Sequence, residues 1–172
     1  MKTRDLVIIA MMSAVLLVVQ VALSFIPNVE LVTLLVIIYT LVLGRKTIFA
    51  IYVFALLEGF LYGFGIWWIM YLYVWTILYF IVRIFKKQEE TLTWSIIGGF
   101  FGLFFGTLCS IPYFFIGGIG AGVAWWASGI LFDIIHGVSN FIVILLLYKP
   151  CYKIISKCYR SFHIEQSGGF KK

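Results

Sequence analysis

The chain alternates apolar stretches with short polar or glycine-containing breaks. A transmembrane helix needs about 20 consecutive, mostly apolar residues, and most of the stretches approach that length. Turn-forming or charged segments separate them, such as Pro27-Asn28 and the charged run at residues 86–90, and a glycine-rich loop is expected over residues 112–122. We therefore predict six transmembrane helices, over residues 6–24, 31–43, 47–62, 66–85, 94–111 and 123–147.

Composition excludes an ordinary soluble domain. Of the 172 residues, 63% are hydrophobic and 12% are charged, and the mean hydropathy is +1.10. Soluble domains are roughly half apolar and about one-quarter charged, so this chain carries more apolar surface than its own core can hide. We predict an all-α membrane protein with one six-helix domain over residues 1–150 and a basic amphipathic cytoplasmic tail over residues 151–172.

Basic residues determine the orientation expected for these helices. The chain has 13 Lys and Arg residues against 7 Asp and Glu residues, which gives a net charge of +6. All 13 basic residues fall on the side of the N-terminus, in residues 1–5, 44–46, 83–93 and 148–172. Because cytoplasmic loops carry an excess of Lys and Arg, both termini are predicted to be cytoplasmic (N-in/C-in). The positive charge then needs no nucleic-acid partner.

In the tail, aromatic and aliphatic residues alternate with basic ones. Tyr152, Ile155 and Tyr159 are interspersed with Lys153 and Lys157. This spacing fits an amphipathic helix lying on the inner leaflet, and a solvated tail fits the composition equally well.

The few ionisable residues inside the apolar stretches are candidate site residues. They are Glu58 in the third stretch and Asp133 and His136 in the sixth. At about 100° per residue, one face of the sixth helix collects Trp126, Asp133, His136 and Asn140, and such residues normally face the bundle interior. This face either contacts a ligand or clamps helices together. In a clamp, Asp133 would accept a hydrogen bond from His136, and Asn140 would bond a backbone carbonyl.

Aromatic residues form a second stripe, in the fourth stretch. Trp68, Tyr71 and Trp75 follow one another at spacings of three and four residues. Aromatic belts at membrane interfaces are common, so belt and packing roles remain open for each ring. Tyr71 and Trp75 lie deeper than a belt requires, and inward-facing rings with polar tips suit a flat or ring-bearing small molecule.

Small residues recur at four-residue spacing in two stretches. In the fifth, Gly98, Gly102 and Gly106 predict close packing inside the protein. In the first, Ala10 and Ala14 form a shorter pattern of the same kind near the predicted cytoplasmic end.

The chain lacks the motifs of several common enzyme classes. It has no GxxxxGK[ST] phosphate loop, no HExxH and no GxSxG. Its three cysteines form no CxxC pair and no cluster with histidine at metal-ligand spacing. We therefore predict no catalytic residue, no metal ligand and no cofactor bound by this chain. His136 and Asn140 have the HxxxN spacing of some intramembrane proteases, which leaves an intramembrane enzyme as the less favoured alternative.

Together these features resemble the substrate-binding S component of an energy-coupling factor (ECF) transporter, an ABC-type system for bacterial vitamin uptake. The resemblance covers residues 5–150. It rests on the short helices with a cytoplasmic N-terminus, the Ala10-xxx-Ala14 face, the loop at residues 27–30 and the polar, aromatic outer halves of the later helices. It implies a compact S-component-like bundle in the bacterial inner membrane.

The resemblance also implies a division of work between subunits. The S component captures a vitamin-type molecule from outside and docks on a transmembrane coupling protein with two ATPase subunits, which use the ATP. The first-helix face that meets the coupling protein corresponds to Ala10 and Ala14. The loop that covers the ligand corresponds to Asn28 and Glu30. The contacts expected from the last three helices are Trp68, Tyr71, Trp75, Trp126, Asp133, His136 and Asn140.

The charges predict a neutral or cationic ligand rather than an anionic one. The predicted outer half carries no Lys or Arg, whereas Glu30, Glu58 and Asp133 supply carboxylates for substrate binding. Thiamine or its pyrimidine, a pyridoxine-type vitamer, queuosine and cobalamin all remain candidates. The alternative function is a self-sufficient, proton-coupled secondary transporter in which Glu58, Asp133 or His136 relays the proton.

Overall fold

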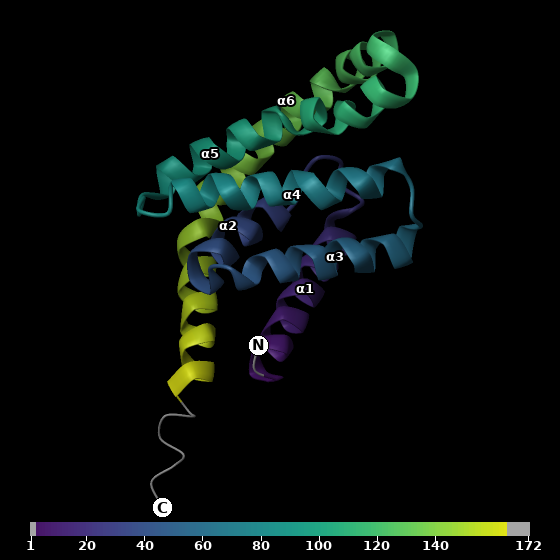
Figure 1. Cartoon of the computed structure of the whole chain (residues 1–172). Helices are drawn as coiled ribbons and strands as arrows, with labels where there is room; N and C mark the ends of the chain where they lie inside the picture. Colours follow the sequence, from purple (N-terminus) through teal and green to yellow (C-terminus); the bar gives the residue numbers. More distant parts are fainter. Residues whose placement is uncertain (1–2, 165–172) are drawn as a thin grey trace, which may run out of the picture.

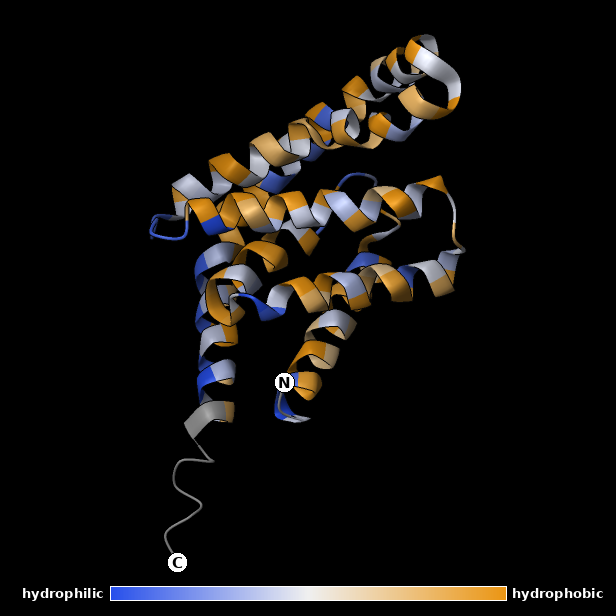
Figure 2. Ribbon diagram, viewed as in Figure 1, coloured by the Kyte–Doolittle hydropathy of each residue, from blue (hydrophilic) through white to orange (hydrophobic). Residues whose placement is uncertain are grey.

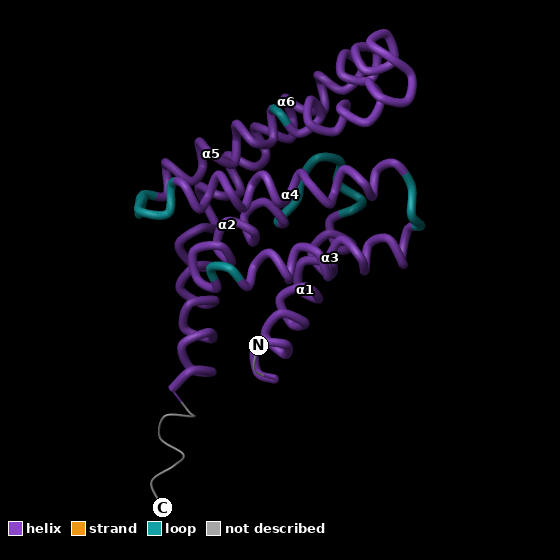
Figure 3. Tube along the Cα trace, viewed as in Figure 1, coloured by secondary structure: helices purple, strands orange, loops and turns teal. Residues whose placement is uncertain are grey.

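The computed structural model describes residues 3–164, and every regular element among them is a helix. In chain order the helices are α1 (Thr3–Leu23), α2 (Val32–Leu43), α3 (Lys46–Tyr62), α4 (Ile66–Ile84), α5 (Thr91–Leu103) and α6 (Phe105–Ile164) (Figure 1). Short loops join the first five helices (Figure 3). The prediction of an all-α protein is therefore confirmed for the described residues.

Helix length and composition agree with a membrane protein. Three helical stretches in the described chain are long and apolar enough to cross a membrane: Thr3–Leu23, Ile66–Ile84 and Thr91–Phe162. Hydrophobic residues recur along all the helices (Figure 2). Many large ones are exposed, such as Phe60, Ile84 and Phe115 at 72%, 76% and 86%. The six separate membrane spans stay a prediction, because α2, with only 12 residues, is shorter than the roughly 20 residues that a crossing needs. The orientation of the helices also stays a prediction.

The last third of the chain consists of two helical arms that meet at Gly118. The stretch labelled α6 is helical through Pro112 but leaves the helical conformation at Gly118, where φ is 74° and ψ is −173°. A connection within residues 112–122 is therefore confirmed, but it is a break at one glycine and not a loop over the whole range. A positive φ of this kind is readily adopted only by glycine. A second break lies at Phe104, between α5 and α6. Helix continuation is favoured in an apolar segment because it satisfies the backbone hydrogen bonds internally.

Helix α2 forms the centre of the bundle. Ten of its 12 residues are buried, and α1, α3, α4, α5 and α6 all pack against it. The most completely buried large side chains of the core include Leu34, Ile37 and Tyr39 from this helix. A helix that is apolar on all faces is stable only when neighbours cover it completely, so α2 sets the positions of the surrounding helices.

The first and last described segments meet at one end of the bundle. Lys46 Nζ at the start of α3 donates to Asp5 Oδ1 of α1 at 2.7 Å and to the Tyr159 hydroxyl of α6 at 3.3 Å. In the tail, α6 runs on through Pro150, and Tyr152 and Ile155 pack against the bundle core. This part of the tail is therefore an amphipathic helix docked on the protein itself, and residues 165–172 lie outside the described residues.

Glycines bring α5 and the first residues of α6 close to the last arm of α6. A Cβ on Gly98 would collide with Ile144, and one on Gly102 would lie 2.8 Å from Gly137 Cα. A Cβ on Gly106 would lie 2.5 Å from Asp133 Oδ1. The predicted stripe of small residues therefore packs inside the protein, as expected.

Gly102→Ala is expected to lower the stability of the bundle, because the new methyl group meets backbone atoms rather than a flexible side chain. Overpacking of this kind costs about 1–3 kcal/mol. Gly120→Ala is the matched control, since a Cβ there meets no atom of the described chain within 4 Å. Thermal unfolding in one detergent measures the difference, and equal Tm values for the two variants would contradict the close packing.

Candidate functional site

The connection between α1 and α2, residues 24–31, contains a tight turn. The Val29 N–H donates to the Ile26 carbonyl at 3.3 Å, and Asn28 has a φ of 61°. Proline is favoured at the first central position of such a turn, and asparagine tolerates the left-handed conformation at the second. The turn predicted at Pro27-Asn28 is therefore confirmed.

A cavity of about 590 Å³ lies against this loop. Its walls come from the end of α1, the loop itself, the first half of α4 and both arms of α6, before and after Gly118. Small-molecule sites typically measure about 300–1,000 Å³. The cavity therefore has the size needed for a small organic ligand.

Aromatic rings form one continuous wall of the cavity. Ring centroids are 5.4 Å apart for Trp67 and Tyr71, and 5.7 Å apart for Tyr71 and Trp75. Trp75 in turn lies 5.6 Å from Phe105 of α6. The three α4 residues recur every four positions, so the helix places them on one face.

Trp75 also leaves an unused polar group at this wall. Its indole Nε1 is buried and has no hydrogen-bond partner among the described residues. Nearly all buried donors in proteins are paired, so this N–H lacks the partner that a buried donor normally has.

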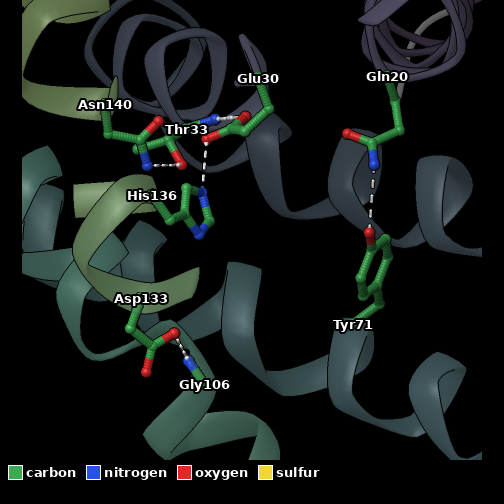
Figure 4. A network of polar contacts seen from close by, with 8 residues as sticks. All are labelled: Gln20, Glu30, Thr33, Tyr71, Gly106, Asp133, His136 and Asn140. Carbon is green, nitrogen blue, oxygen red and sulfur yellow. Dashed lines mark hydrogen bonds and ion pairs between the residues drawn. The ribbon is translucent and has the colours of Figure 1, made fainter. Parts of the chain in front are cut away.

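Glu30 joins the loop to two helices (Figure 4). Its Oε2 accepts the backbone N–H of Thr33, at the start of α2, at 2.8 Å, and its Oε1 lies 3.4 Å from His136 Nε2 of α6. Burial alone raises the pKa of Glu30, but the interactions with His136 and Thr33 outweigh it and hold this pKa below its usual range. Glu30 therefore keeps its charge and fastens the loop over the cavity.

Asp133 occupies the other side of the cavity. Its Oδ1 accepts the backbone N–H of Gly106 at 2.8 Å, in the first turn of α6. A carboxylate at a helix start satisfies a backbone donor and interacts favourably with the helix dipole. The approach is possible because Gly106 lacks a Cβ.

The polar stripe of α6 thus has partners other than those expected for a clamp. Asp133 pairs with Gly106 and His136 with Glu30, so the predicted Asp133–His136 bond was wrong. Asn140 donates to the Thr33 hydroxyl at 3.2 Å, not to a backbone carbonyl. For Asn140 the reason is the position of α2, whose first turn places the Thr33 hydroxyl opposite this face of α6.

A smaller chamber of about 270 Å³ adjoins the main cavity. Glu58 of α3 lines it, is 2% exposed, and has no hydrogen-bond partner for Oε1 within the described chain. Gln20 and Tyr71 line both spaces, and Gln20 Nε2 lies 3.4 Å from the Tyr71 hydroxyl (Figure 4). The two spaces therefore share the two residues that form this long contact.

The structure brings many of the predicted site residues together and leaves others apart. Those lining the main cavity are Asn28, Glu30, Tyr71, Trp75, Asp133 and His136. Trp68 instead donates to the Ala55 carbonyl at 2.8 Å, and Trp126 donates to the Thr107 hydroxyl at 3.0 Å. Asn140 lies deeper, against α2. Ala10 and Ala14 are exposed on α1.

Several lining residues were not predicted, among them Gln20, Phe105 and Trp125. Trp125 had a detectable signal, because at about 100° per residue it lies about 20° from His136 on the helical wheel. Its ring stacks on Tyr113 at 4.1 Å. Gln20 and Phe105 belong to stretches in which no ligand contact was predicted.

Residues 3–164 contain no group of three or more His, Cys, Asp or Glu side chains arranged to hold a metal ion. Comparisons with protein-family models, curated proteins and solved structures find no match to this chain. What the cavity binds is therefore inferred from its own geometry and charges.

Glu30→Gln is expected to loosen the loop, because an amide cannot replace the charged bonds to both His136 and Thr33. Hydrogen bonds to charged groups are worth about 1.5–3 kcal/mol, so backbone amides of residues 24–33 should exchange with deuterium about tenfold faster or more. Hydrogen–deuterium exchange with mass spectrometry measures this. Glu89→Gln, at an exposed position, is the control and should leave exchange unchanged.

Acid should have the same effect on the wild-type loop. The pKa of Glu30 is lowered in the folded protein. The contribution of its carboxylate to the stability of the loop is therefore complete above the ordinary pKa of 4.5, and is lost as the pH falls through the lowered pKa. Glu30→Gln should lack this acid-dependent step. An identical acid response in both proteins would contradict the role given to Glu30.

Proposed function

We propose that this protein is the substrate-binding S component of an ECF-type transporter in the bacterial inner membrane, with both termini cytoplasmic. It captures a vitamin-type small molecule from outside and passes it to a transmembrane coupling protein with two ATPase subunits. The observation that supports this most is the aromatic cavity of about 590 Å³ among helices apolar enough for a bilayer.

The charges around the cavity support a neutral or cationic ligand. Glu30 and Asp133 line it, and no Lys or Arg of the described chain does. An anionic group buried there would lack a fixed cation to pair with, and an unpaired buried charge is costly. A ring-bearing ligand would lie against Tyr71 and Trp75, with an acceptor atom facing Trp75 Nε1 and a donor facing the Asp133 carboxylate.

The loop over residues 24–31 supports capture from one side. Glu30 binds it to α2 and α6 through Thr33 and His136, so the fastened loop covers part of the cavity. Ligand entry then requires the Glu30–His136 contact, the longer of the two at 3.4 Å, to open and re-form. The loop thereby acts as the cover of the binding site.

One face of α1 supports docking on another membrane protein. Ala10 and Ala14 are exposed there, beside Val7 and Met11, which are 49% and 46% exposed. Small residues on a helix face allow a neighbouring helix to approach closely. This face is the proposed contact with the coupling protein.

Trp75→Phe is expected to weaken ligand binding while leaving the fold intact, because it keeps an aromatic ring and removes the unpaired indole donor. The loss of one hydrogen bond to the ligand corresponds to about a fivefold to tenfold weaker Kd. The ligand is first identified by mass spectrometry on protein purified under mild conditions. Trp68→Phe, outside the cavity, is the matched control. Tight binding of a purely anionic vitamin would contradict the charge assignment.

Ala10→Leu is expected to block uptake in cells but spare ligand binding, because the larger side chain interferes with docking and not with the cavity. Ala22→Leu, exposed about three turns farther along the same helix, should affect neither. Radiolabelled uptake with and without the coupling and ATPase subunits provides the measurement. Accumulation by this chain alone in liposomes, driven by a pH gradient, would instead establish the proton-coupled carrier.

A further inference from the structure

The chamber beside the main cavity has a feature that the proposed capture of a ligand does not use. Its walls include Glu58, which is 2% exposed, and the aromatic rings of Tyr62, Trp67 and Tyr71. Glu58 Oε1 has no hydrogen-bond partner in the described part of the chain. The lining of the chamber therefore includes a buried, incompletely paired carboxyl residue together with three aromatic residues.

A buried carboxylate without a partner is energetically costly and is normally paired in native proteins. No Lys or Arg of residues 3–164 lines the chamber, whose other polar members are the uncharged Gln20 and Ser24 and the two tyrosine hydroxyls. A partner for the charged form of Glu58 would therefore come from outside the described chain, as a cation or a hydrogen-bond donor.

The aromatic walls indicate the kind of cation. The faces of Trp and Tyr attract ammonium groups, and aromatic walls around a cation are the usual way to recognise alkylammonium ligands. A hard metal cation such as Ca²⁺ instead takes six to eight oxygen ligands, often from several carboxylates. A chamber with one carboxyl group and three rings suits an organic ammonium better than a hydrated metal ion.

The position of the chamber connects it to the substrate. Gln20, Trp67 and Tyr71 line both the chamber and the main cavity, and the Gln20–Tyr71 contact between them is long, at 3.4 Å. A ligand arm can replace that contact with its own hydrogen bonds at little cost. A molecule held in the main cavity therefore has a short route to Glu58.

We infer that the Glu58 chamber binds an alkylammonium group, as a side subsite for the basic arm of the captured molecule. The link to a captured molecule rests on the proposed function, whereas the recognition of the ammonium group rests on the chamber alone. Glu58 pairs with the charge, and Tyr62, Trp67 and Tyr71 surround the alkyl substituents.

The test uses methylammonium and tetramethylammonium as probes, with equilibrium binding measured on the full-length purified protein in detergent. Wild-type protein should bind the probes saturably, and Glu58→Gln should weaken binding about tenfold or more, because it removes the charge and keeps the shape. Glu89→Gln, an exposed carboxylate outside the chamber, should bind like wild type. Equal Kd values for wild type and Glu58→Gln would overturn the inference.

Tyr62 provides a second test that does not depend on the folding of the Glu58 variant. Its side chain is 53% exposed, so substitutions there are tolerated. Tyr62→Phe keeps the ring and should retain probe binding, whereas Tyr62→Ala should weaken it several-fold. Equal binding by the two variants would show that the ring plays no part, which would contradict the aromatic recognition.

Sodium competition separates an organic ammonium from a free inorganic ion. Sodium chloride added at the same concentration as methylammonium should leave methylammonium bound, compared with the same buffer without added sodium chloride. Full displacement of methylammonium by sodium would overturn the inference in favour of a metal-ion site. The proposed function fails separately, if no ligand co-purifies and Ala10→Leu leaves uptake intact. Neither of those outcomes changes the probe measurements.

Discussion

Polar groups that enter an apolar bundle need partners inside the protein, and this constraint shapes the whole site. Glu30 has such partners in two helices. Its carboxylate joins the loop to the first turn of α2 through Thr33 and to the last arm of α6 through His136. The loop that carries Glu30 is thereby fixed to both helices. The position of the loop depends on this carboxylate, whereas α2 and α6 also pack directly and are joined by the Asn140–Thr33 hydrogen bond.

Some buried polar groups have hydrogen-bond partners inside the protein and hold its helices together, whereas others have none. Asp133 is bonded to the start of α6 through Gly106, so one of its oxygens serves the fold. The buried Nε1 of Trp75 and Oε1 of Glu58 have no partner among residues 3–164, and both residues line hollow spaces. A rigid binding site needs satisfied polar groups where its helices meet. Unsatisfied polar groups in residues that line a cavity can serve a bound ligand.

The sequence predicted the first four helices to within a few residues, because turn chemistry at positions such as Pro27 marks their ends. It also placed a connection around Gly118, but expected a loop over residues 112–122 where the helical conformation is interrupted at a single glycine. It also missed the Glu30–His136 contact, which joins residues far apart in the chain. Periodicity shows which face of a helix is polar, but only the fold shows what lies opposite.

The shortness of α2 has an electrical consequence. Its 12 residues span about 18 Å, about 12 Å less than the hydrocarbon of a bilayer. On the proposed location, Arg45 and Lys46 anchor its inner end at the cytoplasmic interface, so the whole shortfall lies on the outer side, where Glu30 sits. A cation entering the cavity then crosses part of the transmembrane voltage, worth about 2.3 kcal/mol per charge for a full 100 mV. The resting membrane potential would itself draw a cationic nutrient into the site.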